Sequence, residues 1–555
     1  MSLFVGVDVG TGSARAGVFD TKGTLLASHA NNIQMWRDGD VVEQSSSGIW
    51  QAVCASVKAA VTQAGITPDA IKGIGFDAAC SMVVLDRQMQ PLSISTTDDA
   101  SQRNVIVWMD HRAKDQAERI NSQGHSVLDY VGGRISPEMQ TPKLLWLKEN
   151  LPEIFASAGQ FFDLPDFLTW AATGSLTRSA CTVTCKWTYL AHEDRWDDSY
   201  FHQIGLAELA TENYSRIGQS IVPPGTPLAQ GLTQAAADQM GLVSGIPVGA
   251  ALIDAHAGGI GTVGADAQAG PLATMAYVFG TSACTMASSA QPHKVSGVWG
   301  PYYSAMVPGL WLSEGGQSAA GEAIAHLIKT HPAHDEAMEH AADAGLALHD
   351  YLLLKVSERV LNPREAVDLV GTRLIVPEFL GNRAPHADPE ATAVISGLSL
   401  RCDIEDLIKT YVAGIFGVGY GLRQIMNAQA AQGVAPQSIV ISGGAGRSDA
   451  VKQMLADASG YTVLSTNSPE PVLLGAAMLG AMSSGHFASL RDTMSTMSSV
   501  KHVFTPSSPD THKKHAICFK AFEALQKTEQ DLRAELGHQE ISPVSKTSKR
   551  TGSVA

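Results

Sequence analysis

DVGTGSAR, residues 8–15, forms the turn between two apolar strands, FVGVDVG and RAGVFD. A third strand, TLLASH, follows the next turn, so the start of the chain predicts an antiparallel meander rather than a βαβ unit. Small residues at the first turn would let backbone N–H groups and hydroxyls approach a phosphate closely. Asp8, at the end of the buried strand, could then hold a hydrated Mg²⁺ against that phosphate. A hairpin turn with a capping aspartate is the structural alternative.

A similar pattern returns in the second half of the chain. Residues 46–64 carry apolar side chains at helical spacing, and KGIGFDAACSMVVLD predicts one buried strand, so helix and strand alternate and the class is α/β. After a Gly-rich passage over 246–270, PLATMAYVFGTSACTMASS predicts a strand, a turn and a strand, as a weak internal repeat. Its turn, GTSACT at 280–285, indicates a nucleotide clamped between two related half-domains. The absence of any Gly-Lys pair excludes a P-loop.

A third glycine turn, SGGAGRSD at residues 442–449, lies between a predicted strand and a predicted helix. Gly443 and Gly444 lack side chains, which would let a flat purine lie against the backbone. The order of the glycines differs from the dinucleotide fingerprint, which needs G-x-G-x-x-G and a later acidic residue. Turns of this kind are also common without a ligand.

Asp254, in IDAHAGG, ends an apolar strand where the chain enters the Gly-rich passage. Phosphoryl transfer needs a carboxylate that orients the acceptor hydroxyl and takes its proton, and Asp254 is our candidate for this base. A helix cap is the alternative role for Asp254. We interpret His256, two residues on, as structural rather than as a base.

Polar side chains within apolar segments predict a sugar pocket. Lys186 in CTVTCKWTYL and Glu314 in LWLSEGGQSAAGE both need partners that a polyol can supply. Trp108 and Arg112 in VWMDHRA offer a stacking face and a charge, although an ion pair with Asp110 is an equally good reading of Arg112. Residues 100–240, irregular and rich in aromatic side chains, are interpreted as an insertion that shapes the pocket.

Composition excludes several classes of protein. The formal charge of −15 without a basic stripe argues against nucleic-acid binding. We find no apolar run near 18 residues and no leader pattern at the N-terminus, and so expect no membrane association and a cytoplasmic location. The 7 cysteines are scattered and odd in number, which predicts free thiols. Cys181 and Cys185 lack the further ligands of a zinc site.

In this order, DVGTGSAR, VWMDHRA, KLLWLKEN, IDAHAGG, FGTSA and SGGAGRSD resemble the FGGY carbohydrate kinases over essentially residues 1 to 500. The resemblance implies two ribonuclease-H-like domains of the actin and Hsp70 type, with ATP and sugar in the cleft between them. It implies that Asp254 is the general base and that Asp8 and Asp254 hold Mg²⁺, through water. The ATP-binding residues that it implies are Gly10, Thr11, Gly12, Ser13, Arg15, Gly280, Thr281, Ser282, Gly443 and Gly444.

Within that family, the chain is similar to the ribulokinases in AAC at 78–80, DAHAG at 254–258, GTSAC and EGGQS. This similarity implies a sugar site of Ala79, Cys80, Trp108, Arg112, Lys186, Asp254 and Glu314. TCKWTY resembles the D-ribulokinase branch, so the expected reaction is phosphorylation of D-ribulose to D-ribulose 5-phosphate. L-ribulose, D-xylulose and pentitols stay open as substrates. An actin-like ATPase switch is the alternative of another class, whereas a sugar-responsive regulator would need a basic helix-turn-helix.

The resemblance also suggests how the chain is divided. We expect a sugar-binding domain over residues 1–256 and a nucleotide-binding domain over 257–500. A helical extension over 501–540 and a disordered tail over 541–555 are expected to follow, because the last 15 residues lack any carboxylate or aromatic side chain. A homodimer is expected because the family often forms one.

Overall fold

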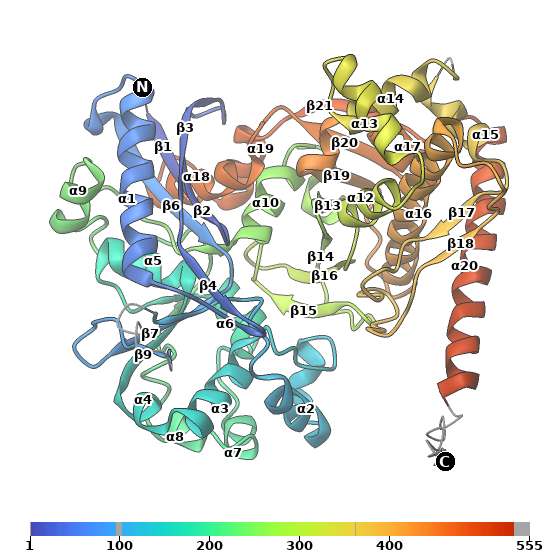
Figure 1. The fold of residues 1–555 in the computed structure, drawn as a ribbon. Helices are drawn as coiled ribbons and strands as arrows, with labels where there is room; N and C mark the ends of the chain where they lie inside the picture. The colour runs from blue at the N-terminus through green and yellow to red at the C-terminus, as the bar shows by residue number, and fades with distance from the viewer. Residues whose placement is uncertain (1, 96–102, 361, 538–555) are drawn as a thin grey trace, which may run out of the picture.

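The computed structural model describes residues 2–95, 103–360 and 362–537, so the tail predicted over 541–555 lies outside the described residues. Two lobes lie side by side (Figure 1). The first lobe, mostly blue to blue-green, is built mostly from the N-terminal half of the chain, and the second, mostly light green to red, from the C-terminal half. In the described part of the chain, no helix is both long and apolar enough to cross a membrane.

The first lobe is built on a sheet with the strand order β12-β6-β1-β2-β3. β1, β2 and β3 form the predicted antiparallel meander, and β6 and β12 continue the sheet parallel to β1. The strands are β1 (Leu3–Val9), β2 (Ser13–Phe19), β3 (Leu25–Asn32), β6 (Ile71–Ala78) and β12 (Leu252–Ile253).

The second lobe repeats this order in its own sheet, β15-β16-β14-β13-β19-β20-β21. β13, β14 and β16 are antiparallel, and β19 and β20 continue parallel to β13. The order β16-β14-β13-β19-β20 therefore matches β3-β2-β1-β6-β12, which confirms the internal repeat and the two ribonuclease-H-like units. The strands are β13 (Thr274–Phe279), β14 (Ala283–Ser289), β15 (Trp299–Tyr303), β16 (Trp311–Gln317), β19 (Ser438–Ser442), β20 (Thr462–Thr466) and β21 (Val500–Phe504).

The prediction of a single strand over KGIGFDAACSMVVLD was wrong. The chain leaves the first sheet after Ala78 and enters another sheet at Met82, with the order β4-β5-β8-β7-β9. At the break, the Ala79 N–H donates to the Val9 carbonyl and the Ser81 N–H donates to the Ala79 carbonyl. Ala79 and Cys80 thus lie where the two sheets of the first lobe meet. The strands of the other sheet are β4 (Met35–Asp38), β5 (Val41–Gln44), β7 (Met82–Asp86), β8 (Val105–Ile106) and β9 (Ala158–Asp163).

Helices of the first lobe cover both sheets and form the predicted insertion. One face of β1 packs on α1, where Val5 and Val7 join the cluster that contains Val53. The helices are α1 (Ser46–Gln63), α2 (Lys114–Gln123), α3 (Gln140–Asn150), α4 (Pro152–Ser157), α5 (Leu164–Thr173), α6 (Ala180–Trp187), α7 (Asp198–Gln203), α8 (Ala207–Thr211) and α9 (Gln234–Met240). The short strands β10 (Arg178–Ser179) and β11 (Ile221–Val222) pair with each other.

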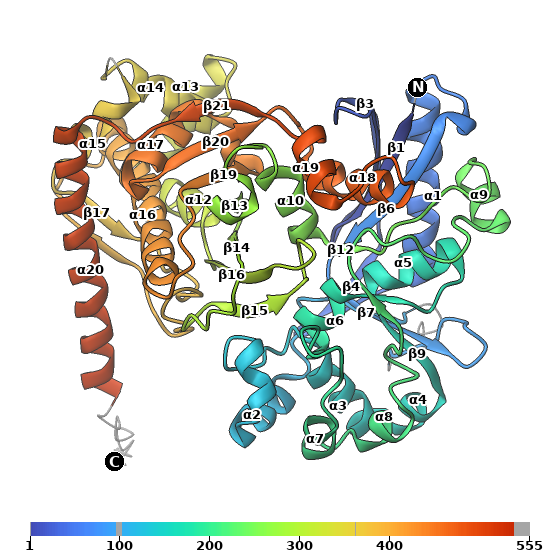
Figure 2. The same ribbon diagram turned by 180° about the vertical axis from the view of Figure 1, so that it is seen from behind.

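The Gly-rich passage contains α10 (Asp254–Val263), which packs against α18 (Pro471–Ser483) from the other end of the sequence. Figure 2 shows α18 beside β1 and β6 of the first lobe rather than within the second sheet. These contacts are made backbone to backbone at glycines. A Cβ atom on Gly6 would overlap the carbonyl oxygen of Leu473, and one on Gly75 that of Ala476. One on Gly475 would overlap the carbonyl oxygen of Ala257.

Gly475→Ala is expected to lower the free energy of unfolding by at least about 2 kcal/mol, because the added methyl group forces α18 and α10 apart. Gly48→Ala, in the first turn of α1, is the matched control. A Cβ atom there would meet its nearest neighbour, the Cβ atom of Ser45, at an ordinary contact distance of 3.6 Å. The control is expected to stabilise the protein slightly, by about 0.5–1 kcal/mol. Urea denaturation of both variants checks this, and equal effects would contradict the packing described.

Helices of the second lobe flank its sheet, with α16 central to its core. They are α11 (Gly270–Ala273), α12 (Gly321–Lys329), α13 (His334–Asp343), α14 (Leu348–Ser357), α15 (Ala366–Val370), α16 (Ile404–Ala431), α17 (Asp449–Ser459) and α20 (Pro509–Gly537). α19 (Leu490–Met497) instead packs on α18 and α10. Residues 501–504, the start of the expected helical extension, instead belong to β21, which pairs with β20 at the sheet edge. α20 then runs down the outer side of this lobe (Figure 2).

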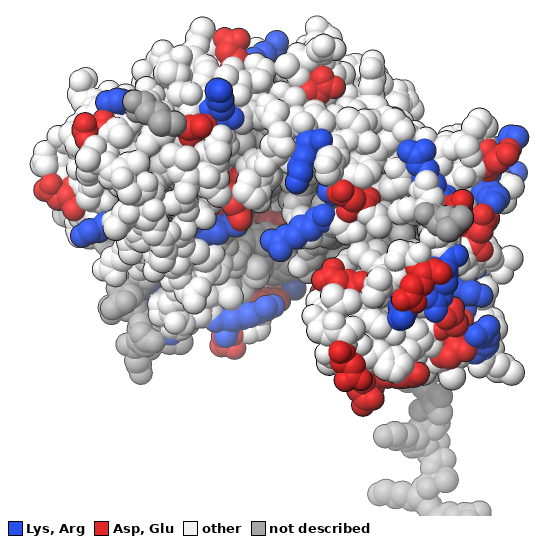
Figure 3. Space-filling model, turned by 90° about the horizontal axis from the view of Figure 1, so that it is seen from above, with Lys and Arg blue, Asp and Glu red and all other residues white. Residues whose placement is uncertain are grey.

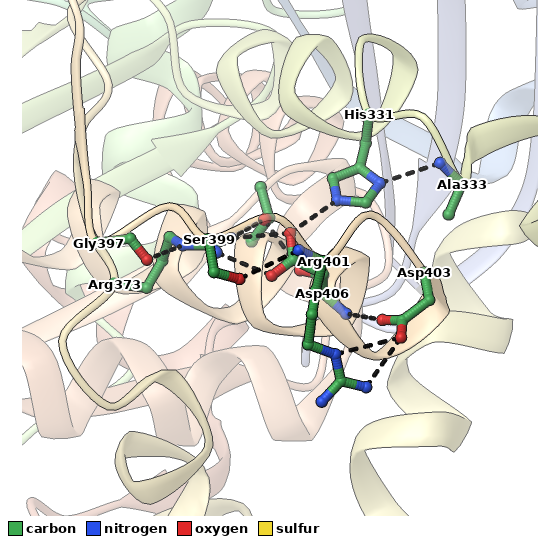
Figure 4. Close-up of polar contacts among 9 residues, drawn as sticks. His331, Ala333, Arg373, Gly397, Ser399, Arg401, Asp403 and Asp406 are labelled. Atoms are coloured by element: carbon green, nitrogen blue, oxygen red, sulfur yellow. Dashed lines mark hydrogen bonds and ion pairs between the residues drawn. The ribbon is translucent and has the colours of Figure 1, made fainter.

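A buried ion-pair network joins the loop after α12, the start of α16 and the residue before the hairpin of β17 (Leu374–Val376) and β18 (Val394–Ser396). Asp406 accepts a hydrogen bond of 2.8 Å from Arg373 and lies 3.2 Å from His331 Nε2 (Figure 4). Arg401 pairs with Asp403, the residue that caps α16. The loop that follows α12 is thereby tied to the start of α16.

From above, the surface is hollowed between the two lobes, and acidic and basic side chains alternate over the face in view (Figure 3). The glycine turns identified in the sequence follow the carboxyl ends of β1, β13 and β19, which are central strands of the two sheets. These turns border the candidate site.

Candidate active site

Three carboxylates gather where the parallel strands of the first sheet end. Asp8 of β1 and Asp77 of β6 face each other in register, and Asp77 is also in register with Leu252 of β12. Asp254 follows β12 directly as the first residue of α10, where its Oδ1 accepts a hydrogen bond of 2.7 Å from the Ala255 N–H. Desolvation, and then the charge of Asp8, raise the pKa of Asp254 to about 6. A carboxylate with a raised pKa suits a general base near neutral pH.

Asp77 is a member of this group that the sequence analysis did not single out. It is fully buried, and neither carboxylate oxygen has a hydrogen-bond partner among the described residues. Burial raises the pKa of Asp77 well above its ordinary value, and the charges of Asp8 and Asp254 raise it further. The signal in the sequence was an acidic residue inside a strand of otherwise apolar and small residues, IKGIGFDA.

Magnesium fits this edge of the sheet. Mg²⁺ is held by one or two carboxylates and keeps several waters, and the orphaned oxygens of Asp77 lie beside Asp8. Asp8 pairs with Arg15, which also reaches Glu470 at 3.3 Å. Among the described residues, no group of three or more His, Cys, Asp or Glu side chains forms a metal site, so a bound Mg²⁺ would take its other ligands from phosphates and water.

Each Gly-Thr turn is closed by a backbone hydrogen bond from its glycine, and the first turn is one residue longer than the second. The Gly10 N–H donates to the Ser13 carbonyl at 3.1 Å, and the Gly280 N–H donates to the Ser282 carbonyl at 2.9 Å. A Cβ atom on Gly10 or Gly12 would meet nothing within 4 Å, so the first turn borders open space. Backbone and hydroxyl groups at both turns can therefore reach a phosphate placed between the lobes.

Trp108 and Arg112 lie in different surroundings. The indole Nε1–H of Trp108 donates to the hydroxyl of Thr11 at 3.0 Å, which places the ring at the first phosphate turn. Arg112 donates to Asp110 and Glu43 and stacks on Trp146, so its guanidinium is held in a buried ion pair. The ion pair with Asp110, given above as the alternative to a sugar contact, is thus the arrangement found for Arg112.

Lys186 and Glu314 are brought together from α6 and β16. Both are largely buried, and the Lys186 ammonium lies 4.9 Å from the centre of the Trp299 ring. Burial alone would lower the pKa of Lys186, but neighbours that include Cys80 and Glu314 raise it well above its ordinary value. No hydrogen bond or ion pair of the ammonium is found among the described residues, which leaves its donors for a ligand.

His256 links Glu314 to the helix that carries Asp254. Its Nε2 lies 3.4 Å from Glu314, and its Nδ1 lies 3.0 Å from the sulfur of Cys181. Burial alone would lower the pKa of His256, but Cys181 and Glu314 raise it to about 10. The imidazolium in turn lowers the pKa of Glu314 to about 2, against the effect of burial and together with Lys186. The raised pKa favours the imidazolium, which lies against Glu314 and can hold that carboxylate in place.

An apolar cavity of about 570 Å³ lies beside Gly444 in the second lobe. Gly443 has a φ of 92°, which favours glycine, and a Cβ atom on Gly444 would meet nothing within 4 Å. Sequence reasoning found the glycines but missed the other walls, which come from α12, the start of α13 and α14. These walls are Gly321, Ile324, Ala325, Ile328, Lys329, His334, Leu348 and His349.

The chain matches the FGGY family of carbohydrate kinases twice. The N-terminal domain of that family matches residues 3–261 and its C-terminal domain matches residues 275–484. A human FGGY carbohydrate kinase domain-containing protein is 46% identical over 94% of this chain and 96% of its own length. A D-ribulokinase of Saccharomyces cerevisiae is 36% identical over 88% of this chain and 73% of its own length. The crystal structure of a xylulose kinase from Rhodospirillum rubrum superposes with a TM-score of 0.78 at 21% identity, covering 97% and 100% of the two chains.

Proposed function

The chain belongs to the FGGY family of carbohydrate kinases, and we propose that within this family it is a D-ribulokinase, which makes D-ribulose 5-phosphate from D-ribulose and ATP. The chain is therefore a phosphotransferase that acts on a sugar, and kinases of this family use ATP. The choice of D-ribulose is supported by the similarity to the yeast D-ribulokinase across most of this chain. The buried, unpaired ammonium of Lys186 opposite Glu314 supports a polyhydroxylated acceptor.

In the proposed reaction, the adenine ring lies in the apolar cavity at Gly443 and Gly444, and the phosphates run to the two Gly-Thr turns. The sugar lies between Ala79, Cys80, Lys186 and Glu314, with one hydroxyl at Asp254. Asp254 takes the hydroxyl proton as the sugar oxygen bonds to the γ-phosphorus, and the bond from that phosphorus to the ADP oxygen breaks. Mg²⁺ at Asp8 would neutralise charge on the phosphates when bound.

We further propose that the sugar is held mainly by residues 1–256 and the nucleotide mainly by residues 257–500. Ala79, Lys186 and Asp254 come from the first lobe, and the cavity at Gly444 lies in the second. Glu314 and the first Gly-Thr turn are the groups that reach across from the opposite lobe. Closure of the lobes would bring the hydroxyl, Asp254 and the γ-phosphate into line and exclude water, which favours transfer to sugar over hydrolysis.

The test of the proposed function is coupled ADP release with magnesium-ATP and a panel of acceptors. D-ribulose, L-ribulose, D-xylulose, L-xylulose, ribitol and glycerol are ranked by kcat/KM. We expect D-ribulose to exceed each of the others by at least about tenfold, because one misplaced hydroxyl leaves a buried polar group unpaired. A higher value for another sugar would reject D-ribulose but keep the kinase.

The reaction is expected to slow in acid with the titration of Asp254. The base works only when ionised, so kcat/KM should fall about tenfold per pH unit below the raised pKa of about 6 and level off above it. A pH profile at saturating ATP, with the coupling enzymes checked at each pH, measures this. A profile that stays flat down to pH 5 would contradict the assignment of Asp254 as base.

Gly444→Val is expected to raise the KM for ATP at least about tenfold, because the new side chain would fill the cavity proposed for adenine. The backbone tolerates the change, since a Cβ atom there meets no protein atom within 4 Å. The melting temperature and the KM for sugar should therefore stay near the wild-type values. An unchanged KM for ATP would place the nucleotide elsewhere.

A further inference from the structure

Arg383 lies in the loop between β17 and β18, on the side of the second lobe that faces the site. The loop around it is braced, since the N–H groups of Asn382 and Asp388 each donate to the other's carbonyl at 2.8 Å. The Asn382 side chain also donates to Glu378, and its Oδ1 accepts from the His386 N–H at 3.0 Å. The backbone that carries Arg383 is thus fixed by its neighbours.

The guanidinium of Arg383 lies between the second phosphate turn and the sugar groups. Its Nη1 lies 3.8 Å from the sulfur of Cys284, two residues after Ser282 of the turn. Its central carbon lies 5.9 Å from the centre of the Trp299 ring, the ring that the ammonium of Lys186 also contacts. Arg383 is close enough to Glu314 to help His256 and Lys186 lower the pKa of that carboxyl.

The same side chain borders a small pocket with Gln317, Ser318 and Ala319. The segment after these residues is bonded to the phosphate turn, because the Ala320 N–H donates to the Thr281 carbonyl at 2.9 Å. The position of Arg383 therefore matches the path that a phosphoryl group takes from the nucleotide turn to a sugar hydroxyl.

Arg383 also differs from the other arginines near the site in having no carboxylate partner within 4.0 Å among the described residues. Arg15 pairs with Asp8 and Glu470, and Arg112 pairs with Asp110 and Glu43. In the same lobe, Arg373 and Arg401 each pair with an aspartate (Figure 4). A guanidinium offers five donors in a plane. One donor of Arg383 is directed at the Cys284 sulfur, and the others make no hydrogen bond among the described residues, which leaves them for an anion.

We propose that Arg383 is a catalytic residue that donates hydrogen bonds to the γ-phosphoryl oxygens during transfer. This inference rests on the proposed kinase reaction and deepens it. As the phosphorus leaves the ADP oxygen and bonds to the sugar oxygen, negative charge spreads over its remaining oxygens, and the sugar proton goes to Asp254. A planar, permanently charged guanidinium stabilises that charge better than a flexible ammonium.

The first test is steady-state kinetics of Arg383→Ala and Arg383→Lys with the preferred sugar. We expect Arg383→Ala to lower kcat by about 10²–10³-fold with little change in either KM, as for other groups that bind transferring phosphoryl oxygens. Arg383→Lys should recover only part of the loss. Arg401→Ala is the matched control, because Arg401 pairs with Asp403 at an exposed position of the same lobe. A kcat for Arg383→Ala within about threefold of the control would overturn the proposal.

A second measurement separates this proposal from the proposed function. Calorimetry compares the affinity for magnesium-ADP with and without fluoroaluminate, which is a planar substitute for the moving phosphoryl group. The wild type should bind ADP with fluoroaluminate at least about tenfold more tightly than ADP, and Arg383→Ala should lose that increment while it keeps its ADP affinity and melting temperature. The proposal would be overturned if fluoroaluminate did not increase the ADP affinity of the wild type. It would also be overturned if fluoroaluminate increased the ADP affinity of Arg383→Ala by the same factor. If the wild type phosphorylates none of the sugars, the proposed function is rejected. The affinities for ADP with and without fluoroaluminate can still be measured in that case.

Discussion

Asp254→Asn is expected to lower kcat by at least about 10³-fold, because it removes the only group that we assign to take the hydroxyl proton. Asparagine keeps the shape of the side chain and the oxygen that accepts from the Ala255 N–H, so the start of α10 should not move. It also removes one charge beside Asp8 and the buried Asp77. The variant should therefore be at least as stable as the wild type.

The measurement is kcat with the preferred sugar, together with ADP affinity by calorimetry and the melting temperature. Asp510→Asn, a change at an exposed aspartate at the start of α20 in the second lobe, is the control and should leave all three values unchanged. Nucleotide binding by Asp254→Asn should stay within a few fold of the wild type. Turnover within about tenfold of the wild type would reject Asp254 as the base.

Lys186→Met is expected to lower kcat/KM for the sugar by at least about 10²-fold. The ammonium is buried without a hydrogen bond from the described residues, so a sugar that supplies acceptors relieves the cost of its desolvation. Methionine has nearly the same length and can keep the contact with the Trp299 ring. Because the variant loses a buried charge and little volume, it should fold.

Sugar kinetics and ATP binding together test the role of Lys186. The affinity for ATP should stay unchanged, since the cavity at Gly444 lies in the other lobe. Lys148→Met is the matched control, because Lys148 is a half-exposed lysine of the same lobe that bonds to Glu208. A normal kcat/KM for the sugar in Lys186→Met would mean that the acceptor binds elsewhere.

Local sequence patterns predicted the two hairpin turns and the repeat well, because each strand-turn-strand unit is specified by adjacent residues. They failed over KGIGFDAACSMVVLD, which is apolar on both sides of the break. At Ala79, where the chain passes from one sheet to the next, the N–H donates a hydrogen bond to the carbonyl of Val9, a residue about 70 positions away. The spacing of apolar and polar residues within a segment does not reveal such long-range pairing.

The candidate site was predictable to a similar extent. Asp8 lies at the end of an apolar strand just before a Gly-rich turn, and Asp254 directly follows a short apolar strand, which gives a local signal. Asp77 matters only because β6 lies in register between β1 and β12. The walls of the apolar cavity, such as Ile324 and Ile328, have the spacing of ordinary core residues of a helix. Nothing in the sequence separates a side chain that lines a cavity from one that fills a core.

The packing of α18 on β1 and β6 has a consequence for the synthesis of the chain. At about 5–20 residues per second, a ribosome reaches α18 roughly 20–80 seconds after it completes β6. Until then, the glycine-lined face of the first sheet has nothing to cover it, and it is exposed to the chaperones that bind nascent chains. The lobe that is translated first is therefore completed almost last, so a chain that stops before residue 471 leaves neither lobe finished.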